Sequence, residues 1–120
     1  MTLKECYNIF GGDYESVLGR LISERLVQKF AVKFLDDKSF DILKESLESG
    51  NYEEAFRAAH TLKGICQNLS FSKLLESSSS LTEALRNKEY GKTDELFLKT
   101  QADYIETVTA INAFKSENEL

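Results

Sequence analysis

Hydrophobic residues recur along the chain at intervals of three and four, which is the spacing of one face of an α-helix. No segment alternates apolar and polar residues in the way a half-buried strand does. The pattern predicts two short helices within residues 1–22 and four long amphipathic segments within 23–117. Because the links are short, consecutive long helices should be antiparallel neighbours. We therefore expect a single all-α domain over residues 1–120: an antiparallel up-and-down four-helix bundle with one or two short N-terminal covering helices.

Residues that favour helix ends divide this pattern. Asp13 and Ser23 are expected to cap helix N-termini, and Gly50 is expected to stop a helix. Ser70 is expected to cap the helix that follows the one starting after Asn51. Asp36 and Asp37 interrupt the apolar stripe, because aspartate prefers caps to helix interiors. The sequence leaves open whether residues 23–49 form one kinked helix or two.

Composition narrows the possible functions. The chain has no proline and six glycines, which favours long helices over a many-stranded sheet. Its net charge of −5 makes nucleic acid and anionic membranes poor partners, and no apolar run is long enough to cross a bilayer. Cys6 and Cys66 lack metal-ligand spacing and suggest no disulfide framework. We expect a cytoplasmic monomer without nucleic-acid or membrane partners and without a metal site or cofactor of its own.

The single histidine lies on the helix predicted to follow Asn51. Most apolar residues of this helix gather in one arc, which holds Tyr52, Ala55, Ala58, Ala59, Leu62, Ile65, Cys66 and Leu69. His60 points away from that arc, and Phe56 lies at its border. Composition and periodicity alone would favour an ordinary surface histidine.

Two neighbours of His60 favour a chemical role instead. Lys63 and Gly64 follow it by three and four residues, so both adjoin the imidazole on the helix surface. A glycine inside a helix costs about 0.5–1 kcal/mol relative to alanine, and on an outer face close core packing does not explain it. The missing side chain would let another protein approach the ring, and the Lys63 ammonium could meet a phosphoryl group. A neutral imidazole is able to attack phosphorus.

The run Ala59-His60-Thr61-Leu62-Lys63-Gly64, with Asn68-Leu69 downstream, resembles the signature of histidine phosphotransfer (HPt) domains. The resemblance covers most of residues 23–115. It implies a helical bundle whose exposed histidine accepts a phosphoryl group from a receiver-domain aspartate and passes it to another receiver. The implied partners are response-regulator receiver domains, hybrid histidine kinases, or both. Any Mg²⁺ would belong to the receiver.

The resemblance also implies roles for individual residues. His60 would be the phosphoacceptor, Lys63 would neutralise the phosphoryl charge, and Gly64 would provide clearance. Three further residues are candidate phosphate or partner contacts: Gln67 on the same helix face, Arg86 on the facing helix, and partly exposed Phe56. Ser70 stands where many family members have glycine.

Two other functions are alternatives to the phosphotransfer hypothesis. A bundle that docks receiver-like partners without phosphotransfer would keep the fold and the face around His60. An enzyme of another class has little to build on, because there is one histidine and no arranged acid or metal set. The chain also lacks a glycine-rich phosphate loop, so we expect a phosphohistidine carrier without ATP-dependent kinase activity.

Overall fold

The computed structural model describes all 120 residues and contains helices but no strand. The elements in chain order are α1 (Leu3–Phe10), α2 (Tyr14–Leu21), α3 (Glu24–Lys33), the 3-10 turn η1 (Phe34–Asp36), α4 (Ser39–Glu48), α5 (Tyr52–Leu69), α6 (Ser72–Arg86), the 3-10 turn η2 (Tyr90–Lys92) and α7 (Thr93–Glu117). The all-α class predicted from the hydrophobic spacing is confirmed. None of these helices is both long enough and apolar enough to cross a membrane.

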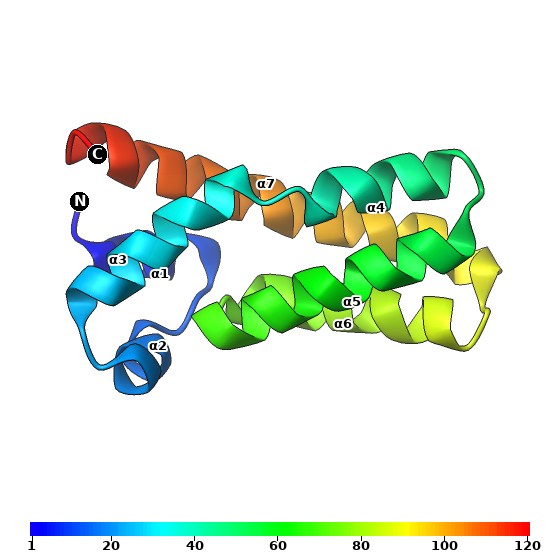
Figure 1. Cartoon of the computed structure of the whole chain (residues 1–120), viewed down its shortest axis with the longest axis horizontal. Coiled ribbons are helices and arrows are strands. Elements are labelled where there is room, and N and C mark those ends of the chain that lie inside the picture. Colours follow the sequence, from blue (N-terminus) through cyan, green and yellow to red (C-terminus); the bar gives the residue numbers. More distant parts are fainter.

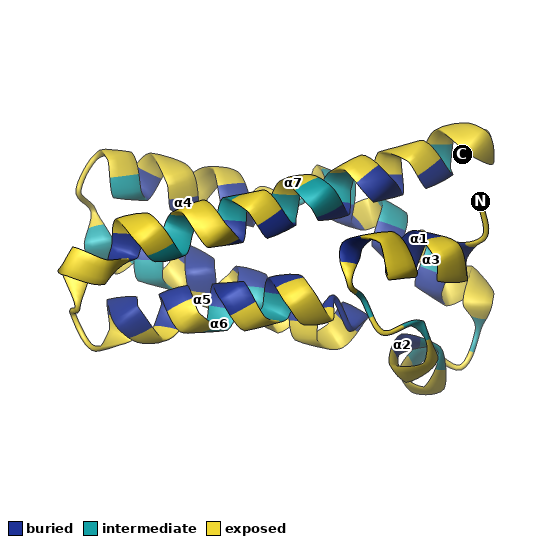
Figure 2. Cartoon of the chain, turned by 180° about the vertical axis from the view of Figure 1, so that it is seen from behind, coloured by how far each residue is buried: buried dark blue, intermediate teal, exposed yellow.

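The long helices form the expected bundle. Helices α4, α5, α6 and α7 lie side by side, and α3 extends α4 beyond the η1 turn (Figure 1). Helices α1 and α2 lie at the end of the molecule that also holds both termini, where α1 packs against α7. Each bundle helix turns one face inward and leaves the other exposed (Figure 2). The molecule is elongated, with principal extents of 41 × 25 × 18 Å.

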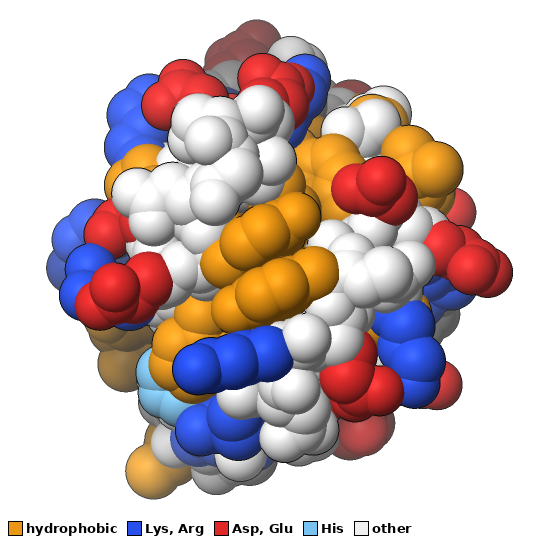
Figure 3. Space-filling model, turned by 90° about the vertical axis from the view of Figure 1, so that its right-hand side faces the viewer, with side chains coloured by type: hydrophobic (Ala, Val, Ile, Leu, Met, Phe, Trp, Pro, Cys, Tyr) orange, Lys and Arg blue, Asp and Glu red, His pale blue; other side chains and the backbone are white.

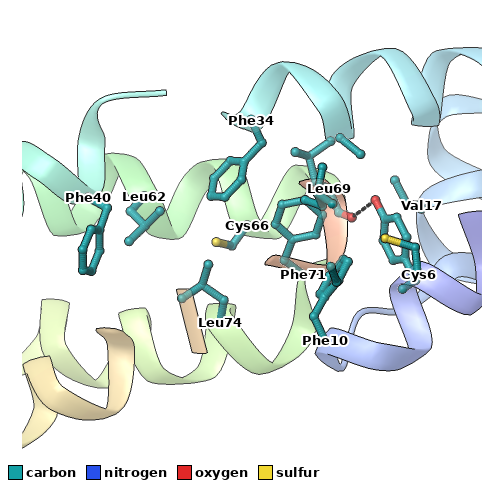
Figure 4. Packing of buried hydrophobic residues seen from close by; sticks show 14 of the residues in the cluster. Cys6, Phe10, Val17, Phe34, Phe40, Leu62, Cys66, Leu69, Phe71 and Leu74 are labelled. Atoms are coloured by element: carbon teal, nitrogen blue, oxygen red, sulfur yellow. Dashed lines mark hydrogen bonds between the residues drawn. The ribbon is translucent and has the colours of Figure 1, made fainter. Parts of the chain in front are cut away.

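One hydrophobic cluster runs through the bundle and under the N-terminal helices. Phe71, between α5 and α6, is fully buried where these parts meet. Its ring lies 5.0 Å from that of Phe10, 5.7 Å from that of Tyr7 and 5.1 Å from that of Phe34, measured between centroids (Figure 4). The aromatic packing ties α1 and η1 to the end of α5, the helix that carries His60.

Most of the predicted helix ends are confirmed. The Asp13 carboxylate accepts a hydrogen bond from the Ser16 amide at 3.0 Å, and the Ser23 hydroxyl accepts one from the Leu26 amide at 3.4 Å. Gly50 follows α4 with φ of 72°, the left-handed conformation that glycine adopts without steric cost. The local chemistry of these side chains was therefore sufficient to place three helix ends.

Ser70 does not have the predicted role, and the prediction was wrong for a geometric reason. Ser70 ends α5 in the left-handed conformation, with φ of 55°, and it is Phe71 that precedes α6. Its hydroxyl donates to Ser16 Oγ and accepts from Arg20, so it binds α2 rather than the N-terminus of α6. Glycine adopts this left-handed backbone without the steric cost that serine has.

The segment 23–49 forms two helices. Helix α3 ends at Lys33, η1 follows, and α4 begins at Ser39. The Asp37 carboxylate accepts a hydrogen bond from the Ser39 amide at 3.0 Å, which satisfies one of the free donors at the start of α4. The predicted interruption at Asp36-Asp37 is therefore a complete break.

Candidate functional site

The sequence of α5 places His60 on the outside of the bundle. The Asn51 side chain accepts a hydrogen bond from the Glu54 amide at 3.2 Å and so caps the helix N-terminus. The inward face is small and apolar, with Ala55, Ala58, Ala59, Leu62, Cys66 and Leu69 all buried. His60 lies opposite this face, exposed to solvent, and its ring forms no hydrogen bond within the chain. Both ring nitrogens are therefore open to an incoming group.

Gly64 lies one turn beyond His60 in open space. A Cβ built at this position would meet no atom within 4 Å outside the local helix backbone. Packing within the chain therefore does not require glycine here, although glycine weakens an α-helix. The absent side chain leaves the approach to the His60 imidazole clear.

Lys63 is half-buried beside His60, and no carboxylate in the chain pairs with its ammonium group. Arg57, by contrast, is held by Glu53 at 2.6 Å and by Glu54 at 2.8 Å. Lys63, which follows His60 in the sequence, is thus unpaired, whereas Arg57, which precedes it, is already neutralised. A free cation beside an accessible imidazole suits the binding of an anionic group.

Phe56 and Arg86 connect α5 to α6 next to the histidine. The Phe56 ring lies 6.0 Å from the His60 ring, with 23° between their planes. The Arg86 guanidinium lies 5.0 Å from the centroid of the Phe56 ring, a distance typical of a cation–π contact. Arg86 also lies 3.3 Å from a Glu83 carboxylate oxygen. The Phe56 ring is therefore a neighbour of both the histidine and the arginine.

An aromatic pair that the sequence did not reveal extends this surface to the end of the bundle. Tyr52 of α5 and Tyr90 of η2 stack with centroids 3.9 Å apart and planes 7° apart. In the view onto this end, an apolar band runs toward the histidine, which lies beside basic side chains (Figure 3). The sequence offered no signal for the pair, because it depends on how the loop before α7 folds back on α5.

Gln67 is exposed, and its side chain makes no hydrogen bond within the chain. It lies seven residues beyond His60, which is about 10 Å along the helix axis. The structure thus places Phe56, Lys63 and Gly64 next to His60, places Arg86 on the Phe56 ring, and leaves Gln67 further away. Whether each residue performs its predicted role remains a prediction.

The C-terminal end of α5 is held by side chains and backbone from α1, α2 and the loop between them. Arg20 Nη1 donates to the Gln67 and Asn68 carbonyls at 3.0 and 2.8 Å, and the Tyr7 hydroxyl donates to the Leu69 carbonyl at 2.9 Å. The Asp13 amide donates to the Ser70 carbonyl at 2.8 Å. The last carbonyls of a helix have no partner within it, so these contacts complete the end of α5.

The Cys66 thiol, which also lies on α5, is unreactive. Burial, and secondarily the Asp37 carboxylate, raises the pKa of the Cys66 thiol far above its ordinary value. Because the thiolate is the reactive form, Cys66 is an inert core residue, as its place in the apolar arc predicted. No group of three or more histidine, cysteine, aspartate or glutamate side chains lies close enough together to hold a metal ion.

Comparison of the chain with known proteins found one match, to a family model. The family model described as Hpt domain matches residues 26–114, which run from α3 into the last turn of α7 and include all the candidate residues. Neither a curated protein nor a solved structure matches the chain.

Proposed function

The chain belongs to the Hpt domain family, and we propose that it is a phosphorelay intermediate that carries a phosphoryl group on His60. The observation that carries the proposal is the exposed His60 imidazole, with no partner in the chain, beside an unpaired ammonium group and an open glycine position. In this role the chain accepts a phosphoryl group from an aspartate of one receiver domain and passes it to another.

The transfer requires a nucleophile from this chain and an aspartyl phosphate from the receiver. The lone pair of one imidazole nitrogen, which we take to be Nε2, attacks phosphorus in line with the aspartyl oxygen. An N–P bond forms as the O–P bond breaks, and the aspartate leaves as a carboxylate. The proton on Nδ1 stays in place. Attack by the carboxylate of a second receiver reverses these bond changes, so each step balances without an added co-reactant.

The neighbours of His60 act on charge and access. Phosphoryl transfer depends mainly on positioning and on positive charge near the equatorial oxygens. Lys63 supplies such a charge from α5. Arg86 of α6, which is paired with Glu83 in the free protein, supplies a second if docking of the receiver releases it from that pair. Gly64 leaves room for the receiver's active-site loops, and Phe56 offers an apolar contact to the docked partner. Gln67 is a more distant hydrogen-bond donor to the partner.

The remaining chemistry belongs to the partner. The receiver, free or within a hybrid histidine kinase, brings the phosphorylated aspartate and the Mg²⁺ that the reaction needs. We propose that the chain has no ATP-dependent kinase activity and that its phosphoryl groups come only from receivers.

Mixing the protein with a ³²P-labelled phosphoreceiver tests the proposal. We expect acid-labile, alkali-stable label on His60 in the wild-type protein and none in His60→Gln. The solvated ring contributes little packing, so this variant should keep its thermal midpoint to within about 2 °C. Asn112→Ala, at an exposed position of α7, serves as the folded control that keeps its label.

Wild-type protein that stays unlabelled across several candidate receivers would contradict phosphotransfer. If the same receivers still bound wild-type protein and His60→Ala with equal affinity, the chain would be a docking module of the same fold. A large loss of stability in His60→Gln would instead mean that the ring is structural.

A further inference from the structure

Helix α7 carries apolar residues on its outer face as well as on its inner face. Ala110, Ile111 and Phe114 are buried in the core, whereas Leu98 and Ile105 point outward with 62% and 52% of their surface exposed. By contrast, every exposed residue of the neighbouring helix α6 is polar or charged. A helix that is apolar on both faces is typically covered on both. The fold covers only the inner face of α7.

The exposed apolar residues belong to a row with the spacing of a coiled coil, which we call the α7 row. Leu98, Ala102, Ile105 and Thr109 follow one another at intervals of four, three and four residues, and all four are exposed and uncharged. Alternating intervals of three and four keep side chains on the line where two helices meet. In the view from behind, α7 runs along the front of the bundle and no other helix lies over it (Figure 2).

The α7 row lies on the opposite side of the bundle from His60. Helix α5 packs between α4 and α6, whereas α7 packs against α6 and α1. In Figure 1, α4 and α5 lie in front of α7 and α6, so α5 and α7 are diagonal to each other. A partner bound to the α7 row would therefore leave the face around His60 open.

The row is complementary in size to a second copy of itself when the two α7 helices are antiparallel. One such register places Leu98 opposite Thr109 of the other copy, and Ala102 opposite Ile105. Each large side chain then faces a smaller one, which lets the two surfaces interdigitate. A parallel pair would instead place each residue opposite its equivalent, and the layer formed by the two alanines would be poorly filled.

Two unpaired charges favour the same register. Asp94 and Lys115 lie beside the two ends of the row, and neither forms an ion pair within the chain. When Leu98 faces Thr109, Asp94 of each copy lies within about one helical turn of Lys115 of the other. Two-fold symmetry makes this contact twice, and both contacts join opposite charges.

A second pair of charges lies on the other flank of the row. In the antiparallel register, Lys99 of each copy approaches Glu106 of the other. Within one chain, Lys99 lies 2.7 Å from Asp103, and Glu106 lies 2.9 Å from Lys73. Lys99 and Glu106 are both partly exposed, so they can add a contact across the pair while they keep these partners. No like charges face each other on either flank.

We propose that the α7 row is a self-association surface, through which two copies of the chain form a two-fold symmetric dimer with antiparallel α7 helices. The contact would run from Asp94 to Lys115, which is about 30 Å along the helix axis. A single helix from each copy buries less surface than a standard protein interface, so we expect a Kd of about 10–100 μM.

This dimer replaces the monomer expected from the sequence, because the sequence does not show which face of α7 the other helices leave uncovered. Each copy would keep its own His60 on the side remote from the contact. One dimer would then present two separate sites to receiver domains. The dimer itself does not depend on phosphotransfer, so His60→Gln should associate as the wild-type protein does.

Sedimentation equilibrium of the full chain from about 5 μM to about 500 μM tests the proposal. We expect the weight-average mass to rise with concentration from that of one chain, 13.6 kDa, toward twice that value. Ile105→Arg should raise the dimer Kd by about tenfold or more, because it brings two uncompensated charges into an apolar contact. Its unfolding midpoint should stay within about 2 °C of the wild-type value, since residue 105 is exposed.

Ile42→Arg is the matched control for this variant. Ile42 is also exposed, at 41%, but lies on α4. The substitution adds the same charge to the molecule, so a general effect of charge on association would appear in both variants. We expect Ile42→Arg to associate with the wild-type Kd.

A charge exchange tests the antiparallel register. Asp94→Lys should raise the dimer Kd by about threefold or more, because it places two cations together at each end of the contact. The double variant Asp94→Lys/Lys115→Asp restores opposite charges and should return the Kd to near the wild-type value. A parallel pair would not show this recovery, because Asp94 and Lys115 would then lie at opposite ends.

Engineered cysteines give a second test of the register. Under air oxidation, a mixture of the Ala102→Cys and Ile105→Cys proteins should form a disulfide-linked dimer faster than either protein alone. The antiparallel register places these two positions opposite each other, and neither of them opposite its own equivalent. The native thiols of Cys6 and Cys66 are buried and should not compete.

Three results would overturn the proposal. The first is a mass that stays at that of one chain up to about 500 μM. The second is equal association of the wild-type protein and Ile105→Arg. The third is a charge exchange that fails to restore association, together with disulfide formation that is fastest in either cysteine variant alone. None of these results bears on labelling of His60, so the dimer and phosphotransfer can fail independently.

Discussion

Lys63 differs from the other cations near His60 because nothing in the chain neutralises it. If it stabilises charge in the transition state, Lys63→Ala should slow phosphoryl transfer by about tenfold or more, since loss of one electrostatic contact commonly costs at least that much. Receiver affinity should fall less than about threefold, because exposed interfacial charges add little binding energy. Single-turnover transfer and a separate Kd measurement check this. Lys63→Arg should restore most of the rate, and equal losses in rate and affinity would make Lys63 an interface charge only.

The role of Gly64 in leaving room for the partner can be tested against Gly19, which is also exposed on a helix. A Cβ at either position would meet no atom within 4 Å outside the local helix backbone. Gly64→Leu and Gly19→Leu should each stabilise the protein by about 0.5–1 kcal/mol, as leucine favours helix. Only Gly64→Leu should impair transfer, by at least about tenfold, since its side chain would lie beside the His60 ring. Urea unfolding and transfer kinetics measure both effects. Equal transfer by the two variants would remove the steric role.

The N-terminal helices influence α5 through the contacts that complete its C-terminal end. Arg20→Ala would remove three hydrogen bonds, to the Gln67 and Asn68 carbonyls and to the Ser70 hydroxyl. We expect a loss of about 1–2 kcal/mol in the free energy of unfolding, because these bonds are partly exposed. Amide hydrogen exchange should accelerate in the last turn of α5 more than around His60.

Arg25→Ala is the control for this effect, since Arg25 lies on the neighbouring helix and forms no ion pair. It should change the free energy of unfolding by less than about 0.5 kcal/mol. If both variants lost the same stability, Arg20 would be an ordinary surface cation and α1 and α2 would not support α5.

At the level of elements, local chemistry was a good guide and long-range contacts were not. Periodicity predicted the helices, and the wheel of α5 placed His60 outside and Cys66 inside, as the structure confirms. Arg20 was missed because its acceptors lie 47–50 residues away, and no local pattern links α2 to the end of α5. Ser70 was misassigned because serine also suits N-caps, and only the path of the chain between α5 and α6 decides its left-handed conformation.

The same limit applies to the face around His60. Lys63 and Gly64 follow His60 on one helix, so their spacing alone predicted that they adjoin it. Arg86 comes from another helix, and its place on the Phe56 ring depends on how α5 and α6 pack. The sequence can therefore predict a site within one helix more readily than its completion by a neighbour.

The molecule as a whole holds its N-terminal helices with buried groups that must stay protonated. Burial, and secondarily the Glu117 carboxylate, raises the pKa of Cys6 to about 11, and burial raises the pKa of Tyr7 still further. Both groups bind their protons more tightly in the folded state than in the unfolded state. Near neutral pH they are protonated in both states, so the free energy of unfolding should be constant there. It should fall above the unfolded-state pKa of a cysteine, which is about 8.5, and continue to fall up to the folded-state values.

Each buried acid contributes at most about 1.4 kcal/mol per pH unit to this fall, so urea midpoints between pH 7 and pH 11 should resolve it. Tyr7→Phe should lower the free energy of unfolding by about 1 kcal/mol at pH 7, because the variant lacks the hydrogen bond to the Leu69 carbonyl. Above pH 10, however, its free energy of unfolding should decline less steeply than that of the wild-type protein. The difference between Tyr7→Phe and wild-type protein should therefore shrink as pH rises. A constant difference across this range would mean that the Tyr7 hydroxyl reaches solvent in the folded protein, and that α1 does not seal the end of the bundle.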